Sequence, residues 1–217
     1  MKLRNRAETI LEVLVGIVIL TVVLTGAFAI LSRAVRSNIN VKNRVIALNI
    51  VRDGIEGVRN IRDTNWLKYS GSKRENWLCV DDLTPCTKIS NGFYTIDFDG
   101  DTGEYLLEDV VSAEELDLEG SSAGAESFRL YEDLTSTDGR VTHNDDFGTN
   151  PETVFYRQIE LEIGDPFDSP PSFCDALPCT DSVLRVISRV QWEEDIGVKE
   201  VVAETHLFDF YERGSYE

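Results

Sequence analysis

One uncharged run near the N-terminus constrains this chain more than any other feature. Residues 13–32 carry no charged side chain, and a single acid, Glu12, directly precedes them. These 20 residues would form a helix of about 30 Å, which matches the hydrocarbon core of a bilayer. Lys2, Arg4 and Arg6 lie upstream and mark the cytoplasmic end of such a helix. We therefore expect a single-pass membrane protein with its N-terminus in the cytoplasm.

Charge is distributed unevenly along the 217 residues. Residues 1–65 hold 10 Lys and Arg against 5 Asp and Glu, whereas residues 66–217 hold 11 against 34 and carry a net charge of −23. A surface this acidic repels phosphate groups, so we expect no direct binding of nucleic acid. Such a composition is typical of a soluble head exposed outside the membrane.

The sequence predicts four consecutive segments: a basic leader at residues 1–7, a transmembrane helix at 8–32, an amphipathic extension of that helix at 33–66, and a β-rich extracytoplasmic head at 67–217. In the extension, apolar residues recur every three or four positions, which predicts one stripe that packs on the head. The stripe comprises Val41, Val45, Leu48, Val51, Ile55, Val58 and Ile61.

The predicted fold class is α+β, with the long N-terminal helix packed on an antiparallel sheet. No proline interrupts residues 8–66, and Gly54 and Gly57 are the positions where the helix could bend, because each costs about 1 kcal/mol relative to alanine. Alternating sequence predicts hairpins and strands in the head. The predicted strands are residues 93–98 with 104–111, 127–131, 140–143, 153–163, and 183–192 with 198–210, and residues 112–125 are expected to form a surface loop.

All four cysteines lie in the head, as two local pairs: Cys79 with Cys86, and Cys174 with Cys179. In an oxidising compartment each pair would close a small loop, and each closure would stabilise the fold by roughly 2–2.5 kcal/mol. A four-cysteine zinc site is the alternative, but zinc sites usually use tighter pairs, and the expected compartment favours disulfides.

The junction before the apolar run has three interpretations. A cleaved secretory signal would use the A-x-A-like site at residues 27–29, although the apolar run is long and Glu12 interrupts its start. The second interpretation is a plain signal anchor, which would hold the chain in the membrane. The third rests on a short basic leader that ends at a small residue, Ala7, and on an acid, Glu12, five positions into the chain that would begin at Glu8.

In these features, and in the stretch T-I-L-E-V-L-V-G-I-V-I-L of residues 9–20, the chain resembles the type IV prepilin and pseudopilin family. Ala7 replaces the commoner glycine, and Glu8 stands where the family more often has Phe or Met. Residues 54–66, 153–161 and 186–192 are also similar to PilV-like minor pilins, which extends the likeness over most of the chain.

The resemblance implies that a prepilin peptidase cuts between Ala7 and Glu8, that the new N-terminal Glu8 is N-methylated, and that Glu12 pairs with the terminal amine of a neighbouring subunit during assembly. An ionised carboxylate in lipid costs a few kcal/mol, and such an ion pair would offset this cost. The alternative is that the Glu12 side chain reaches the lipid headgroups and needs no partner subunit. The implied partners are other pilin subunits, an assembly ATPase and a platform membrane protein. The implied location is the cytoplasmic membrane before assembly and a cell-surface pilus afterwards.

An acidic turn offers a candidate calcium site. Asp97, Asp99, Asp101 and Glu108 fall at the first, third, fifth and twelfth positions of an EF-hand loop, but Thr102 occupies the sixth position, which requires glycine. A hairpin turn rich in Asp and Gly explains the same residues.

Nothing in the sequence indicates catalysis. The two histidines, His143 in a polar loop and His206 in a strand, have no metal-binding spacing, and no phosphate-binding or nucleophile motif is present. We therefore expect no cofactor and a filament subunit rather than an enzyme. The alternatives are a membrane-anchored binding or adhesin head that does not polymerise, and a secreted enzyme released by signal peptidase.

Overall fold

The computed structural model describes ten stretches of the chain, and for residues 4–9 only the backbone. The stretches are residues 4–69, 76–81, 83, 85–110, 114–120, 124–134, 139–146, 148–164, 183–195 and 197–209. The chain divides into two compact units, Met1–Val45 and Ile46–Glu217, which are treated separately below.

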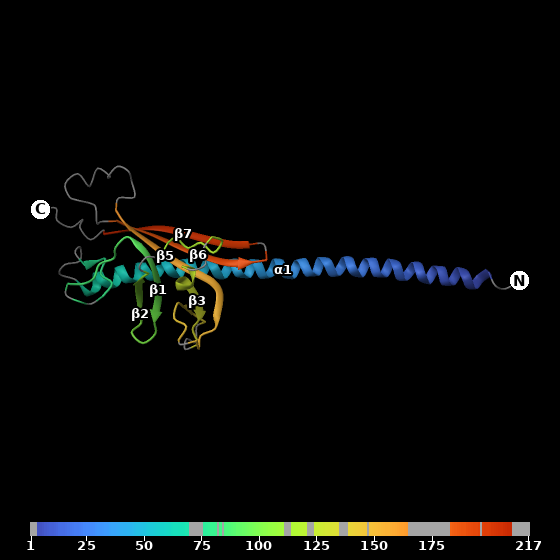
Figure 1. The fold of residues 1–217 in the computed structure, drawn as a ribbon, viewed down its shortest axis with the longest axis horizontal. Helices are drawn as coiled ribbons and strands as arrows, with labels where there is room; N and C mark the ends of the chain where they lie inside the picture. The colour runs from blue at the N-terminus through green and yellow to red at the C-terminus, as the bar shows by residue number, and fades with distance from the viewer. Residues whose placement is uncertain are drawn as a thin grey trace. The chain divides into compact units, whose positions relative to one another are not determined.

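Helix α1 (Arg4–Lys68) contains every described residue of the first unit and also begins the second (Figure 1). Its length confirms the predicted long helix, which ends two residues later than expected. No proline interrupts it, and Lys68 in its last turn complements the negative end of the helix dipole.

In the second unit, the strands form one antiparallel sheet of seven strands, which confirms the α+β class (Figure 1). Both predicted hairpins are present, as is the long strand predicted at residues 153–163. The elements are β1 (Gly92–Asp99), β2 (Glu104–Asp109), the 3-10 helix η1 (Ala125–Phe128), β3 (Arg129–Glu132), β4 (Val141–Thr142), β5 (Glu152–Ile163), β6 (Val183–Glu194) and β7 (Gly197–Phe208).

Strand β5 is the centre of the sheet because three strands pair with it. Along one edge it pairs continuously with β6, which then pairs with β7. The other edge is divided: β3 pairs as far as Tyr156, and β1 pairs from Ile159 onward. Among the described strands, Arg157 and Gln158 therefore have no strand partner on the divided edge.

The main core lies between α1 and the sheet. Ile55, Val58 and Ile61 of the helix share one buried cluster with Ile96, Ile159, Val186 and further apolar side chains of the strands. A second cluster joins Ala47, Ile50 and Val51 to Phe155, Val190 and Trp192. Full burial of one large aliphatic side chain contributes about 1.5–3 kcal/mol, so these clusters hold residues 46–68 against the sheet.

The structure corrects the prediction of one continuous buried stripe on the helix. Val51, Val58 and their neighbours are buried, but Val41 is 61% exposed, Val45 51% and Leu48 38%. Within the second unit, side chains of the head bury the stripe from Val51 onward, whereas Leu48 is only partly covered.

The glycines at positions 54 and 57 allow close packing rather than a bend, since α1 continues through both. A Cβ atom at Gly54 would lie 2.7 Å from Cδ1 of Ile159, and one at Gly57 would lie 2.6 Å from Cδ1 of Ile96. The helix therefore approaches the sheet at a distance that only glycine permits at these two positions.

The opposite face of the sheet carries a smaller cluster, formed by Leu116, Ala125, Phe128 and Tyr156. The described part of the predicted surface loop, residues 114–120, is held on this face. The Gln158 amide nitrogen donates to Glu114 O, and its oxygen accepts from Leu116 N. The strand expected at residues 127–131 begins only at Arg129, because η1 precedes it and buries Phe128 in this cluster.

Candidate functional site

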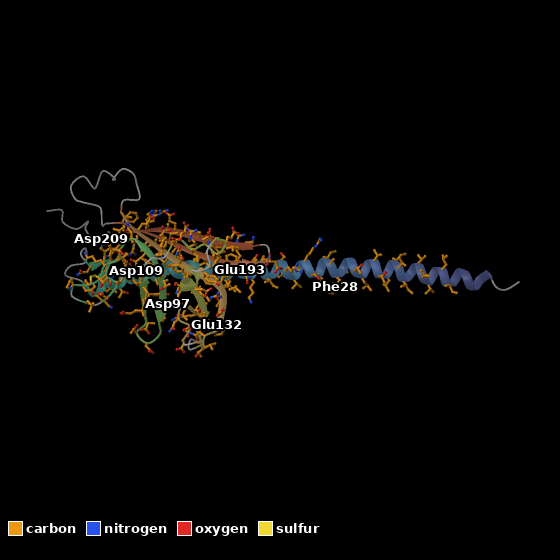
Figure 2. The ribbon with its side chains drawn as sticks, in the orientation of Figure 1. Phe28, Asp97, Asp109, Glu132, Glu193 and Asp209 are labelled. Atoms are coloured by element: carbon orange, nitrogen blue, oxygen red, sulfur yellow. A yellow bond between two sulfur atoms is a disulfide. The ribbon has the colours of Figure 1, made fainter. Side chains whose placement is uncertain are left out.

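The first unit exposes an unbroken apolar helix surface. The large apolar side chains from Ile10 to Leu31 are 48–70% exposed, Phe28 among the most exposed (Figure 2). By length and composition α1 is able to cross a membrane, a test that a secretory signal near the N-terminus would also pass. The surface is far more apolar than a helix in water retains without a covering partner.

Polar side chains inside the apolar run are satisfied within the helix itself. The hydroxyl of Thr25 donates to Thr21 O at 2.9 Å, that of Thr21 to Val18 O at 2.8 Å, and that of Ser32 to Phe28 O at 2.9 Å. Such bonds leave no hydroxyl without an acceptor in a lipid environment. The run is therefore compatible with hydrocarbon on all sides.

Glu12 is the exception in this surface. Its side chain is exposed, and among the residues that the structure describes no hydrogen bond or ion pair engages its carboxylate. Ala7 and Glu8, the predicted cleavage residues, lie within α1, where only the backbone is described. A lone carboxylate thus stands at the start of a surface suited to lipid, where an ionised acid costs about 3 kcal/mol.

The predicted disulfide Cys79–Cys86 is present, with 5.7 Å between the Cα atoms. Cys79 is buried, and the Asn65 side chain near the end of α1 donates to Trp77 O at 3.1 Å and to Cys79 O at 2.7 Å. The closed loop is therefore attached to the end of the helix. Cys174 and Cys179 lie outside the described residues.

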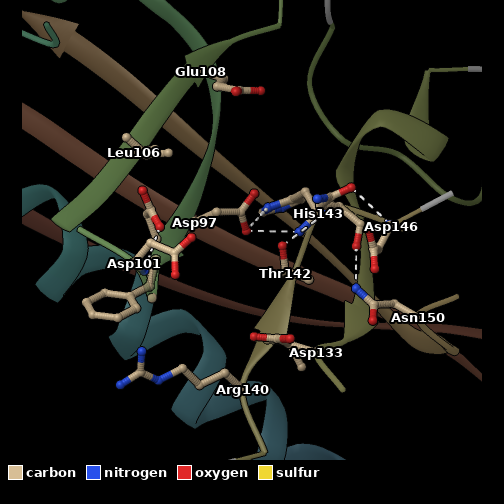
Figure 3. Close-up of a pocket in the computed structure, with 15 residues that line it drawn as sticks. Asp97, Asp101, Leu106, Glu108, Asp133, Arg140, Thr142, His143, Asp146 and Asn150 are labelled. Carbon is tan, nitrogen blue, oxygen red and sulfur yellow. Dashed lines mark hydrogen bonds and ion pairs between the residues drawn. The ribbon is translucent and has the colours of Figure 1, made fainter. Parts of the chain in front are cut away.

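An acidic cleft of about 910 Å³ lies between the β1–β2 hairpin and the segment after β4 (Figure 3). The calcium candidates Asp97, Asp99, Asp101 and Glu108 all line it. Asp99 serves the turn: its carboxylate accepts from Asp101 N at 2.8 Å and from the Thr102 hydroxyl at 2.8 Å, and these bonds lower its pKa. Within the described residues, no three acidic, His or Cys side chains converge on one metal position.

Asp97 faces inward from the cleft wall toward His143 (Figure 3). Its Oδ1 accepts from His143 N at 2.9 Å and lies 3.0 Å from His143 Nδ1, while His143 Nε2 lies 3.1 Å from Arg157 O. Both ring nitrogens of His143 thus lie within hydrogen-bonding distance of an oxygen atom. Burial raises the pKa of Asp97, but bonds from His143 and the charges of His143 and Arg157 outweigh it, so the net pKa is lowered.

The centre of this network is Arg157, whose side chain is 1% exposed. Its guanidinium donates to Asp53 on α1 at 2.9 Å and to Ile96 O on β1, and lies 3.9 Å from Asp97. Arg157, which lies on β5, therefore links α1 to β1. It does so at the point where β3 stops pairing with β5 and β1 begins.

Sequence reasoning missed this network and treated His143 as an incidental loop residue. One signal was available: alternation along β5 places Arg157 on the same face as the apolar Phe155 and Ile159. A charge on an apolar strand face implies a buried partner.

These observations define the class of the protein. A long N-terminal helix with an apolar, exposed first part packs its second part on an antiparallel sheet in a disulfide-bonded head, which is a pilin-like architecture. No family model, curated protein or solved structure matches this chain.

Proposed function

We propose that the chain is a type IV pilin-like subunit, a minor pilin or pseudopilin, that enters a filament through its N-terminal helix. A prepilin peptidase would remove residues 1–7 and leave Glu8 as the N-terminus, where it would be N-methylated. Before assembly the helix would anchor the subunit in the cytoplasmic membrane with the head outside. Its partners would be sister subunits, an assembly ATPase and a platform protein, and its role structural rather than enzymatic.

The observation that carries the proposal is Glu12. Its carboxylate is exposed on an apolar helix and has no partner among the described residues of its own chain. Lipid offers it no compensation, whereas the terminal amine of a neighbouring subunit at the same depth would supply a charge-assisted hydrogen bond in low dielectric. A filament of such helices provides this neighbour, and a lone anchor does not.

N-terminal sequencing of the membrane and filament fractions tests the processing step. A mature N-terminus at Glu8 supports the subunit, Met1 or Lys2 supports a non-polymerising anchored head, and a start near Ile30 supports a secreted product of signal peptidase. The last two results contradict the proposal.

The variant Glu12→Ala tests the assembly step. Membrane insertion should be unchanged or improved, because the change removes a charge from an apolar surface. Incorporation into sheared filaments should fall about tenfold, which corresponds to the loss of about 1.4 kcal/mol per contact. Thr9→Ala, a neutral change in the same turn, is the control. Normal incorporation of Glu12→Ala would contradict the ion-pair role.

A further inference from the structure

We propose that the face of the sheet opposite α1 carries a peptide-binding groove, and that the segment which fills this groove is exchanged with the same segment of a second copy of the chain. The segment comprises residues 114–120, which we call the strap. The inference rests on the proposed function and deepens it, because exchanged straps would link neighbouring heads in a filament. The groove itself lies entirely within the head.

Two glutamines on neighbouring strands hold the strap by its backbone. Gln158 on β5 is fully buried, and Gln191 on β6 is 8% exposed. The Gln158 amide nitrogen donates to Glu114 O at 2.8 Å, and its oxygen accepts from Leu116 N at 2.9 Å. The Gln191 side chain donates to Leu116 O at 2.9 Å and accepts from Leu118 N at 3.1 Å. The two side chains thus bind the backbone of alternate residues, as a neighbouring strand would.

One apolar side chain and one charge complete the contact. Leu116 is 3% exposed and shares a buried cluster with Phe128 and Tyr156. Glu115 Oε1 lies 2.5 Å from Arg189 Nη2, whereas five of the seven strap residues are exposed. The groove is therefore suited to an extended peptide in which an acid precedes a large apolar residue, and it places few other demands on the sequence of the peptide.

The strap is attached to the sheet by few contacts. No described strand pairs with it, so the bonds from the two glutamines, the ion pair and one buried leucine hold it in place. Segments with few buried apolar contacts open at a lower free energy than core strands do. The strap therefore opens while the sheet stays folded, and its opening uncovers both the Gln158 carboxamide and the pocket of Leu116.

A second copy is the occupant because it carries the peptide that fits. An uncovered apolar pocket and an amide without a partner both favour binding of a new peptide. A neighbour's strap restores every contact, including the ion pair with Arg189, and needs no new complementary surface. Exchange of identical segments is for this reason a low-cost route to association, and the proposed filament raises the effective concentration of the neighbour's strap.

Hydrogen exchange of the unaltered full chain in detergent tests whether the strap opens separately. The amide hydrogens of Leu116 and Leu118 should exchange at least about tenfold faster than those of Val186 and Val190 in the centre of β6. Equal rates would overturn the proposal, because the strap would then open only together with the sheet.

A labelled synthetic peptide of residues 114–120 tests the groove by fluorescence anisotropy. Leu116→Ser in the full chain removes the anchor of the chain's own strap, so this variant should bind the peptide at least about tenfold more tightly than the unaltered chain. The matched control is Leu134→Ser, which changes a leucine of the head that is 58% exposed and should leave binding unchanged. Equal binding by the two variants would overturn the proposal. The hydrogen-exchange test needs no variant and decides the matter even if Leu116→Ser does not fold.

Isotope mixing identifies the occupant. Filaments are assembled from equal amounts of unlabelled and nitrogen-15-labelled chain that carries a photoreactive amino acid in place of Leu118. After irradiation, mass spectrometry should find adducts between the strap of one copy and residues 183–194 of a differently labelled copy. Adducts confined to one copy, or to a different protein, would overturn the exchange. Absence of filaments would instead refute the proposed function, while the peptide titration would still decide whether the groove exists.

Discussion

The close contact between α1 and the sheet yields a quantitative prediction at Gly54. In Gly54→Ala, the new Cβ would lie 2.7 Å from Ile159 Cδ1 and 2.8 Å from Ser188 Oγ. Both neighbours are fully buried, so neither has space to move away. Overpacking of this kind lowers the free energy of unfolding by about 1–3 kcal/mol. The higher helix propensity of alanine raises it by about 1 kcal/mol. We expect a net loss of about 1 kcal/mol in the free energy of unfolding.

Ser188 allows the packing cost to be isolated. Its buried hydroxyl has no hydrogen-bond partner among the described residues, so Ser188→Ala alone should stabilise the head by about 1 kcal/mol. The same change removes one of the two close contacts of the new methyl group. Gly54→Ala should therefore cost at least about 0.5 kcal/mol less in the Ser188→Ala background, as a coupling energy between contacting residues.

The assay is urea unfolding of the full chain in detergent, followed by the fluorescence of the three tryptophans, Trp66, Trp77 and Trp192, all buried in the head. Asn49→Ala, an exposed site on the same helix, measures helix propensity alone and should stabilise by about 0.5 kcal/mol. If Gly54→Ala stabilised the head as much as Asn49→Ala does, or showed no coupling to Ser188→Ala, the close-packing argument would be wrong.

Three further predictions concern the head. Arg157→Met should lower the unfolding free energy by about 2 kcal/mol, because it removes the donor to the Ile96 carbonyl and the cation beside Asp53 and Asp97; urea titration measures this, and a loss below about 1 kcal/mol would contradict it. Replacing Cys79 and Cys86 together by Ser should cost about 2–2.5 kcal/mol without reductant, and an unchanged urea midpoint would count against it. Since the pKa of Asp97 lies below its ordinary 3.8 in the fold, its contribution is complete above about pH 4 and is lost as the pH falls through the folded pKa; Asp97→Asn should flatten the acid limb of the stability curve, and an unaltered limb would refute this.

The elements of the fold could be predicted from sequence where local pattern and burial agree. Strand β5 alternates clearly, and both hairpins have Asp- and Gly-rich turns, so their positions differ from prediction by only a few residues. The helix was predictable because no proline interrupts it. In each case the signal lies within one element.

The errors arise where burial depends on another element. The stripe from Val41 to Ile61 has one continuous period, but its side chains are buried only from Val51 onward, and no helix periodicity reveals where that burial begins. Residues 114–120 are mostly exposed, as predicted for a surface loop, but the sequence did not reveal what holds them, because the polar side chains of Gln158 and Gln191 give no sign of a partner 40 or more residues away.

The two charged groups on apolar surfaces, Arg157 and Glu12, differ in a way that bears on assembly. Arg157 is buried, and its own chain supplies Asp53, Asp97 and a backbone carbonyl to compensate its charge. Glu12 stands at the start of an apolar surface, where its charge also needs a compensating partner, yet no described residue of its own chain supplies one. Because an uncompensated charge in low dielectric costs several kcal/mol, Glu12 is the residue at which the proposed assembly can be tested: in the proposed filament, the terminal amine of a second copy would supply the compensating charge that the described residues of its own chain do not.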